Sequence, residues 1–397
     1  MTIRTTHVGS LPRTPELLDA NRARREGSLD EADFASLLQD QVDGVVKRQT
    51  EIGLDIVNDG EYGHAMIDTV DYGAWWTYSF SRFGGLSFED VQRFDVRPPA
   101  GRHGRLSFSS FAQRRDWQRF ADAYGDPDSG IHIANRTPIA FPTITGELTY
   151  IGAEAVERDI AGTKHALEAA GKLVSDGFVA AISPGSAARV ANAFYEDDEA
   201  VVWACADVLR EEYKRITDAG LTVQIDAPDI AEGWDQMNPE PSVEDYRTFS
   251  RVRIDALNHA LEGIDPDLVR FHVCWGSWHG PHTTDIAFKD IVDLALLVNA
   301  NGLTFEAANA RHAHEWTIWR DTPLPVGKYL IPGVVSHSTN VVEHPELVAQ
   351  RIRQFADIVG DERVVASTDC GLGGRIYPSI AWAKLEALAQ GARLASK

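Results

Sequence analysis

The chain has 397 residues, 44% of them hydrophobic and 24% charged, which is typical of a soluble globular protein with an ample core. Its formal net charge of -21 argues against nucleic acid and anionic membranes as partners, because both require a basic surface. Only three cysteines occur, and the sequence shows neither a signal-peptide apolar region nor an apolar stretch of membrane-spanning length, so a cytoplasmic protein is predicted.

Short β-branched runs alternate with helical patterns along the chain. Eight such runs predict strands, at residues 6–10, 54–58, 178–183, 222–226, 269–274, 303–307, 329–335 and 364–369. The segments between them are amphipathic, and residues 200–219 place Val201, Cys205 and Leu209 on one apolar side. Alternating strands and helices indicate a parallel sheet, and eight units predict a closed (β/α)8 TIM barrel of the α/β class.

The spacing of these units breaks once, because more than a hundred residues separate Glu61 from Phe178. We interpret this segment, about 62–177, as an insertion after the second strand of a single domain spanning 1–397, since no polar linker flanks it. It is rich in aromatic residues such as Trp75, Trp76 and Tyr78. These rings either form a lid over a substrate or simply pack the insertion onto the barrel.

Four residues at the ends of later strands predict a metal site: His272, Cys274, Glu306 and Cys370. His272 and Cys274 are two apart, so on a strand they point to the same side. Glu306 lies 32 residues after Cys274, and Cys370 lies 64 after Glu306, which match one and two steps of a roughly 30-residue βα repeat. Two thiolates, an imidazole and a carboxylate suit Zn²⁺. Taken singly, such a cysteine is usually a buried apolar residue, as we predict for Cys205.

Six motifs in chain order resemble the cobalamin-independent methionine synthase family, in particular its catalytic C-terminal barrel and its single-barrel relatives. They are Gly-Ser-Leu-Pro at 9–12, Gly-Glu at 60–61, Gln-Ile-Asp-x-Pro at 224–228, His-x-Cys at 272–274, the strand-borne Glu306, and Asp-Cys-Gly at 369–371. The resemblance covers nearly the whole chain. It implies a Zn²⁺ that activates a substrate thiol such as homocysteine as a zinc thiolate, and methylation of that thiol from a methylfolate or a similar donor.

The resemblance also implies roles for four further residues. In the family, the residues matching Ser10, Glu61 and Asp226 hold the amino-acid part of homocysteine, and two carboxylates at a barrel mouth can bind an ammonium group. Alone, a serine or an aspartate at such a position is equally suited to cap a helix. His337, in Pro-Gly-Val-Val-Ser-His, resembles the family's proton donor, a role that an imidazole near neutral pH can fill. The alternative is a packing or surface histidine.

Two histidine-rich segments, 275–282 and 311–315, run past strand ends, and we interpret them as orienting groups or loop structure. The resemblance does not extend to the N-terminal half that full-length methionine synthases use for polyglutamyl folate, so we expect a chain without that half. The family's folate-contacting stretch is echoed only by residues 79–83 and 97–99.

Two other functions remain open. In the epoxyalkane:coenzyme M transferases, which are single-barrel relatives, the thiol opens an epoxide, and the sulfonate of coenzyme M requires Arg or Lys in the pocket. Glu61 and Asp226 favour an amine-bearing thiol instead. A non-catalytic, zinc-stabilised binding protein is the third possibility, although a large barrel does not need zinc to fold. Neither the acceptor thiol nor the oligomeric state follows from the sequence.

Overall fold

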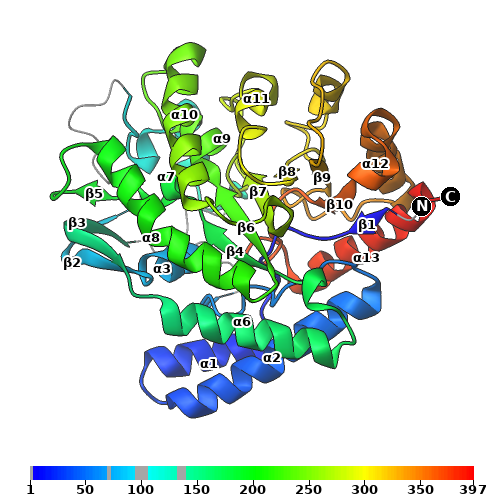
Figure 1. Ribbon diagram of the computed structural model, residues 1–397, viewed down its shortest axis with the longest axis horizontal. Helices are drawn as coiled ribbons and strands as arrows, with labels where there is room; N and C mark the ends of the chain where they lie inside the picture. Colours follow the sequence, from blue (N-terminus) through cyan, green and yellow to red (C-terminus); the bar gives the residue numbers. More distant parts are fainter. Residues whose placement is uncertain (1–2, 69–72, 94–105, 132–139) are drawn as a thin grey trace.

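The computed structural model describes residues 3–68, 73–93, 106–131 and 140–397. Its centre is a curled parallel sheet of seven strands, in the order β1-β10-β9-β8-β7-β6-β4 (Figure 1). The strands are β1 (Arg4–Thr5), β4 (Phe178–Ile182), β6 (Thr222–Ala227), β7 (Val269–Val273), β8 (Gly302–Phe305), β9 (Tyr329–Val335) and β10 (Val365–Thr368). Nearly all their residues are buried, which explains why they read as continuous apolar runs.

The two N-terminal strands differ from the prediction. The first covers Arg4–Thr5 instead of the predicted 6–10, and the φ of 134° at Gly9 is not compatible with an extended strand through that residue. Residues 54–58 form no strand but a single bridge, between Val57 and Gly177. Ile56 N also donates to Thr5 O at 3.0 Å, so this segment contacts both β1 and the start of β4. The closed eight-stranded barrel stays a prediction.

Seven long helices form an outer layer around this sheet: α1 (Pro15–Arg25), α2 (Glu31–Ile52), α6 (Ala153–Ala169), α8 (Asp198–Asp218), α10 (Val243–Ala260), α12 (Pro345–Val359) and α13 (Pro378–Ala395). Helix α2 illustrates how the sequence sets their bounds. Asp30 caps its first turn by accepting from Ala32 N and Asp33 N, and Gly53, at φ 95°, ends it. Helix α8 buries the predicted apolar side, including Cys205. None of the described helices is long and apolar enough to cross a lipid bilayer.

A second, three-stranded sheet lies at one end of the molecule. It consists of β2 (Phe83–Arg93), β3 (Ala140–Tyr150), antiparallel to β2, and β5 (Ala191–Asn192), parallel to β3. The shorter helices are α3 (Gly73–Phe80), α4 (Arg115–Arg119), α5 (Ala121–Gly125), α7 (Pro184–Ala187), α9 (Pro228–Asp235) and α11 (Val292–Ala295). Single 3₁₀ turns are η1 (Phe111–Gln113), η3 (Val174–Asp176), η4 (Pro266–Leu268), η5 (Phe288–Asp290), η6 (Glu315–Arg320) and η7 (Asp361–Arg363).

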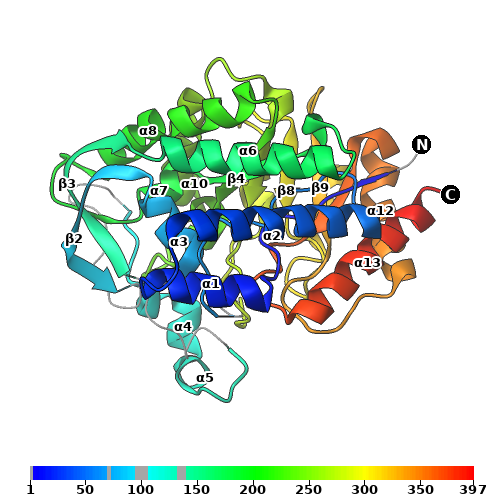
Figure 2. The ribbon, with the colours of Figure 1, turned by 90° about the horizontal axis from the view of Figure 1, so that it is seen from below.

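The segment predicted as an insertion contributes α3, β2, α4, α5 and β3, and Figure 2 shows α4 and α5 projecting from the main body. Its aromatic residues pack both within it and onto the rest of the chain: the Trp76 and Phe80 rings lie 5.1 and 5.3 Å from that of Phe141, and the Phe111 ring lies 5.5 Å from that of Trp278. Helix α6, also within 62–177, belongs to the outer layer and contacts α2 and α8. Residues 97–99 lie outside the described residues, and the bounds of the insertion stay a prediction.

The contact between β9 and β10 leaves no room for a side chain at Gly333. A Cβ at this position would lie 2.5 Å from Asp369 Cα and 2.7 Å from Asp369 N, which are backbone atoms. We therefore expect Gly333→Ala to lower the free energy of unfolding by about 1–3 kcal/mol, measured by urea denaturation. Gly44→Ala is the control, because nothing lies within 4 Å of a Cβ there, in the middle of α2. It should raise stability by about 0.5–1 kcal/mol, and equal effects of the two substitutions would contradict this account.

Candidate metal centre and substrate site

Three predicted ligands meet at the carboxyl ends of two strands. His272 lies near the end of β7, Cys274 follows that strand, and Cys370 follows β10 by two residues. One ligand atom from each lies within 4.8 Å of the others, and all three side chains are buried. The two Sγ atoms are 4.0 Å apart. Two thiolates bound to one tetrahedral zinc at 2.3 Å are separated by roughly 3.8 Å, so the spacing fits a shared metal.

The imidazole of His272 is oriented as a metal ligand would be. Its Nδ1 pairs with Asp226 Oδ1 at 3.0 Å, which sets the tautomer. Its Nε2 is buried and has no hydrogen-bond partner among the described residues. A buried nitrogen without a partner is costly unless a ligand satisfies it, and a carboxylate on the opposite nitrogen is the usual support of a metal-bound histidine. The residues present therefore fit a bound metal ion.

The thiols also differ from an ordinary buried cysteine. The hydrogen bond between Cys274 and Cys370 lowers the pKa of Cys370 and raises that of Cys274, so the pair favours one thiolate at neutral pH. Cys205 lies apart from this pair, and burial raises the pKa of its thiol. It lies in the apolar side of α8, in agreement with its prediction as a core residue.

Glu306, the fourth predicted ligand, falls in a neighbouring group. Its carboxylate shares a 4.8 Å cluster with His337 and Asp369, and not with the three residues above. Glu306 Oε1 accepts from Trp275 N at 3.0 Å, and Oε2 accepts from Asn309 Nδ2 at 2.7 Å. The first bond links Glu306 to the residue after Cys274. Its place in the ligand set stays a prediction.

His337 lies two residues beyond β9 and is buried. Neither of its ring nitrogens has a hydrogen-bond partner among the described residues, while its carbonyl oxygen pairs with His279 Nε2 at 3.0 Å. Burial, followed by the charge of Arg375, holds the pKa of His337 well below its usual value. The ring is therefore a neutral imidazole facing the cluster of Glu306 and Asp369.

The predicted substrate-binding residues lie beside His272, Cys274 and Cys370, which are called the metal group below. Glu61 has a positive φ of 58°, rare for a residue with a side chain, and its carboxylate lies over Gly9. A side chain at Gly9 would overlap Glu61 Oε1. Ser10 Oγ accepts from Arg13 Nη1 at 2.9 Å and lies against the loop after Cys370. Burial and the charge of Asp226 raise the pKa of Glu61 to about 8, which places both carboxyl groups in one region.

The structure gives Asp226 a role that the sequence did not predict, since it holds the ligand His272. Asp226 Oδ1 also accepts a hydrogen bond from Gln224 Nε2 at 2.7 Å. Asn309, which donates to Glu306 and to Asp369 Oδ2, was likewise missed. The available signal was its position three residues after Glu306.

The two histidine-rich segments form a buried charged network in the loops, and their role as orienting groups stays a prediction. His312 bonds Asp285 at 3.1 Å and Glu315 at 2.8 Å, and Asp285 also pairs with His282 at 3.2 Å. Although burial opposes it, Asp285 and Glu315 raise the pKa of His312 to about 10. The ring of His312 lies 4.4 Å from that of Trp275, so the network joins the loops after β7 and β8.

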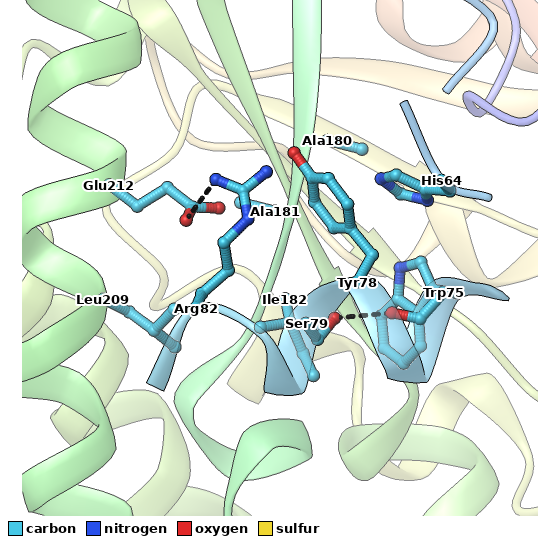
Figure 3. A pocket seen from close by; sticks show the side chains of 10 residues that line it. All are labelled: His64, Trp75, Tyr78, Ser79, Arg82, Ala180, Ala181, Ile182, Leu209 and Glu212. Carbon is cyan, nitrogen blue, oxygen red and sulfur yellow. Dashed lines mark hydrogen bonds and ion pairs between the residues drawn. The ribbon is translucent and has the colours of Figure 1, made fainter. Parts of the chain in front are cut away.

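A small pocket lies next to Glu61, lined in part by His64, Tyr78, Arg82 and Glu212 (Figure 3). His64 Nδ1 is 3.5 Å from Glu61 Oε2, and its ring lies 3.7 Å from that of Tyr78. Arg82 is paired with Glu212 at 3.3 Å and with Asp159 at 3.0 Å. Arg82 and Glu212 in the pocket lining are thus paired within the protein, and His64 links the lining to Glu61.

Fold and site together define an α/β protein whose candidate metal-binding residues lie at the carboxyl ends of parallel strands. The family model described as "Cobalamin-independent synthase, Catalytic domain" matches residues 3–75 and 133–393. The chain belongs to this cobalamin-independent methionine synthase family, as its motifs predicted. Its membership of the family supports the prediction that the protein is an enzyme. The match omits residues 76–132, which lie within the predicted insertion.

Individual relatives are distant. A 2-hydroxypropyl-CoM lyase of Xanthobacter autotrophicus is 25% identical, over 99% of this chain and 95% of the relative. A 5-methyltetrahydropteroyltriglutamate–homocysteine methyltransferase of Chelativorans sp. is 24% identical over 96% of this chain, which spans only 41% of that relative. A solved B12-independent methionine synthase from Shewanella sp. W3-18-1, in complex with selenomethionine, shares the fold with a TM-score of 0.68 at 18% identity, covering 99% and 98% of the two chains.

Proposed function

We propose that the protein is a zinc-dependent methyltransferase that activates a substrate thiol, such as homocysteine, and methylates its sulfur. The observation that carries the proposal is the buried group of His272, Cys274 and Cys370, with an imidazole nitrogen that lacks a partner and two sulfur atoms at metal-sharing distance. We assign Glu306 as the fourth ligand, because it follows the adjacent strand β8 and bonds the residue next to Cys274. We also propose that the strands close into a (β/α)8 barrel around this site.

Zinc, when bound, supplies a Lewis acid that lowers the pKa of a coordinated thiol and so provides a nucleophile at neutral pH. The protein's own residues would then hold and orient the substrate. Glu61 and Asp226 bind its ammonium group, since two neighbouring buried carboxyl groups gain a counter-charge from it. Ser10 lies beside them, and His337 donates a proton to the leaving group of the methyl donor.

The methyl donor is a methylfolate or a smaller substitute. The name of the Chelativorans relative includes a methylated folate, and the present chain spans 41% of its length. The experiment is to incubate the zinc-loaded protein with homocysteine and a methyltetrahydrofolate carrying a labelled methyl group, and to follow label in methionine. If no methyl donor transfers its methyl group to the thiol although the thiol binds tightly, the methylation proposal is excluded and the thiol-activation proposal is kept.

Thiol addition to an epoxide is the second candidate, favoured by one observation. The 2-hydroxypropyl-CoM lyase matches this chain over 95% of its own length, unlike the Chelativorans methyltransferase. This reaction would use the same metal group, and the electrophile alone would differ. Consumption of epoxypropane in the presence of 2-mercaptoethanesulfonate, without methyl transfer to homocysteine, would establish it.

Glu61→Gln tests the substrate role. We expect it to weaken homocysteine binding by about 1.5–3 kcal/mol, the range for hydrogen bonds to charged groups, and to leave the zinc content unchanged. Isothermal titration calorimetry of the zinc protein gives the affinity, and Glu386→Gln, on the exposed face of α13, is the matched control. Asp226→Asn should behave differently, lowering zinc affinity by about 10- to 100-fold, because Asp226 also orients His272. Loss of zinc in Glu61→Gln would contradict this division of roles.

A further inference from the structure

Arg375 joins the two loops that carry the cysteines. It follows β10 in the turn that begins at Cys370. Its Nε donates to Ser277 O at 3.1 Å, in the loop after β7, and its Nη1 donates to Gly373 O at 3.0 Å. The guanidinium thus lies where the loop of Cys274 meets the loop of Cys370.

The backbone of this turn is fixed against the N-terminal loop, so the position of Arg375 is fixed as well. Leu372 N and Gly373 N both donate to Ser10 O, at 2.9 and 2.8 Å. A Cβ on Gly373 would lie 2.6 Å from Ser10 Oγ, which explains the glycine at this close approach. Arg375 is therefore placed relative to a predicted substrate residue as well as to the cysteines.

Three residues of the candidate site experience the charge of Arg375. After the hydrogen bond from Cys274, this charge helps to lower the pKa of Cys370, and after burial it helps to lower the pKa of His337. Burial and Asp226 raise the pKa of Glu61, and Arg375 acts in the opposite direction. Cys370, His337 and Glu61 are buried, whereas Arg375 is half-buried.

Arg13, the other cation near Glu61, has a different environment. It is buried and donates to backbone oxygens of Leu11, Gly60, Glu61 and His64 in addition to Ser10 Oγ. These bonds organise the loop that carries Glu61. A guanidinium has five N–H donors, so anchoring the loop through Ser277 O and Gly373 O and binding a ligand are compatible functions for Arg375.

We propose that Arg375 is a specificity-determining residue that binds the anionic group, a carboxylate or a sulfonate, of the substrate thiol. The inference rests on the proposed function, since it presumes that a thiol binds at the metal group. The site then presents both signs of charge around the sulfur position, with Glu61 and Asp226 for an ammonium group and Arg375 for an anion. A guanidinium binds either anion with charge-assisted hydrogen bonds.

The test compares thiols that share one carbon skeleton. Zinc-loaded protein is titrated calorimetrically with 2-mercaptoethanesulfonate, 2-mercaptoethanol and cysteamine, which differ only in the terminal group, and with homocysteine and 3-aminopropanethiol, which differ only in the carboxylate. Arg375→Gln should weaken binding of the sulfonate and of homocysteine by about 10- to 100-fold. Binding of the three thiols without an anionic group should change less than about twofold, with zinc content unchanged. Arg375→Lys should restore part of the loss.

The matched control is Arg363→Gln, since Arg363 is also half-buried and also donates to backbone carbonyls, those of Lys328 and Leu324. It precedes β10, at the opposite end of the strand, and should alter no thiol affinity. Equal weakening of neutral and anionic thiols in Arg375→Gln, or no weakening, would overturn the proposal while leaving the proposed function intact. Zinc-independent binding of every thiol by the parent protein would overturn both. Preference of the parent for homocysteine identifies the anion as carboxylate, and preference for 2-mercaptoethanesulfonate identifies it as sulfonate.

Discussion

Replacement of Cys274 by serine should reduce the zinc content from about one ion per chain to a small fraction of that value, and Cys370→Ser should do the same. The two sulfur atoms lie 4.0 Å apart beside the unpartnered His272 Nε2, so each supplies a ligand that a neutral hydroxyl replaces poorly. Catalysis should fall with the metal. The measurement is elemental analysis of dialysed protein, with far-ultraviolet circular dichroism to establish that each variant is folded.

Cys205→Ser provides the control within the same chain, because this residue is equally buried but lies in the apolar side of α8. It should retain zinc and lose stability, since a hydroxyl replaces a thiol among apolar neighbours. Full zinc occupancy in both Cys274→Ser and Cys370→Ser would refute the metal centre. Zinc loss confined to Cys205→Ser would show that the wrong cysteines were assigned.

The meeting of His272, Cys274 and Cys370 could be predicted because their spacing follows from strand geometry. His272 and Cys274 are two residues apart at the end of β7, and Cys370 follows β10, so a parallel sheet brings them to one edge. Residues 54–58 do not form the second expected strand because a side chain takes the place of a backbone partner. Asp55 Oδ2 accepts from Thr5 N at 2.8 Å, and this side-chain bond replaces a backbone bond that a strand over 54–58 would need. An alternating apolar pattern does not reveal such competition.

The supporting residues could not be predicted, because their contacts join distant parts of the chain. Asp226 reaches His272 across neighbouring strands, and Arg375 reaches Ser277 across 98 residues. From sequence neighbours alone, an aspartate such as Asp226 is equally suited to cap a helix, and an arginine such as Arg375 is usually a surface charge. The motifs placed Asp226 at the substrate site, but only the packed structure shows that it also pairs with His272 and that Arg375 lies beside the metal group. The sequence spacing likewise did not predict that Glu306 lies in a cluster with His337 and Asp369.

His337→Ala should lower kcat by about 10²- to 10⁴-fold, the usual contribution of a general acid, while thiol affinity and zinc content stay unchanged. The ring is buried, its nitrogens have no hydrogen-bond partner among the described residues, and burial holds its pKa well below the usual value. The ring is therefore neutral at neutral pH, and it must take up a proton before it can act as an acid, which the negative charge that develops on the leaving group favours. His337→Asn should be similarly slow, since an amide cannot transfer the proton.

Single-turnover kinetics with saturating thiol separate this effect from binding, and His259→Ala, at a half-buried histidine on α10 that pairs with Asp207, controls for the loss of an imidazole elsewhere. Zinc loss in His337→Ala would identify the residue as a metal ligand together with Glu306, its neighbour in the second cluster. A near-normal kcat would exclude His337 as the proton donor. The next candidate would then be His279, whose Nε2 lies 3.0 Å from His337 O.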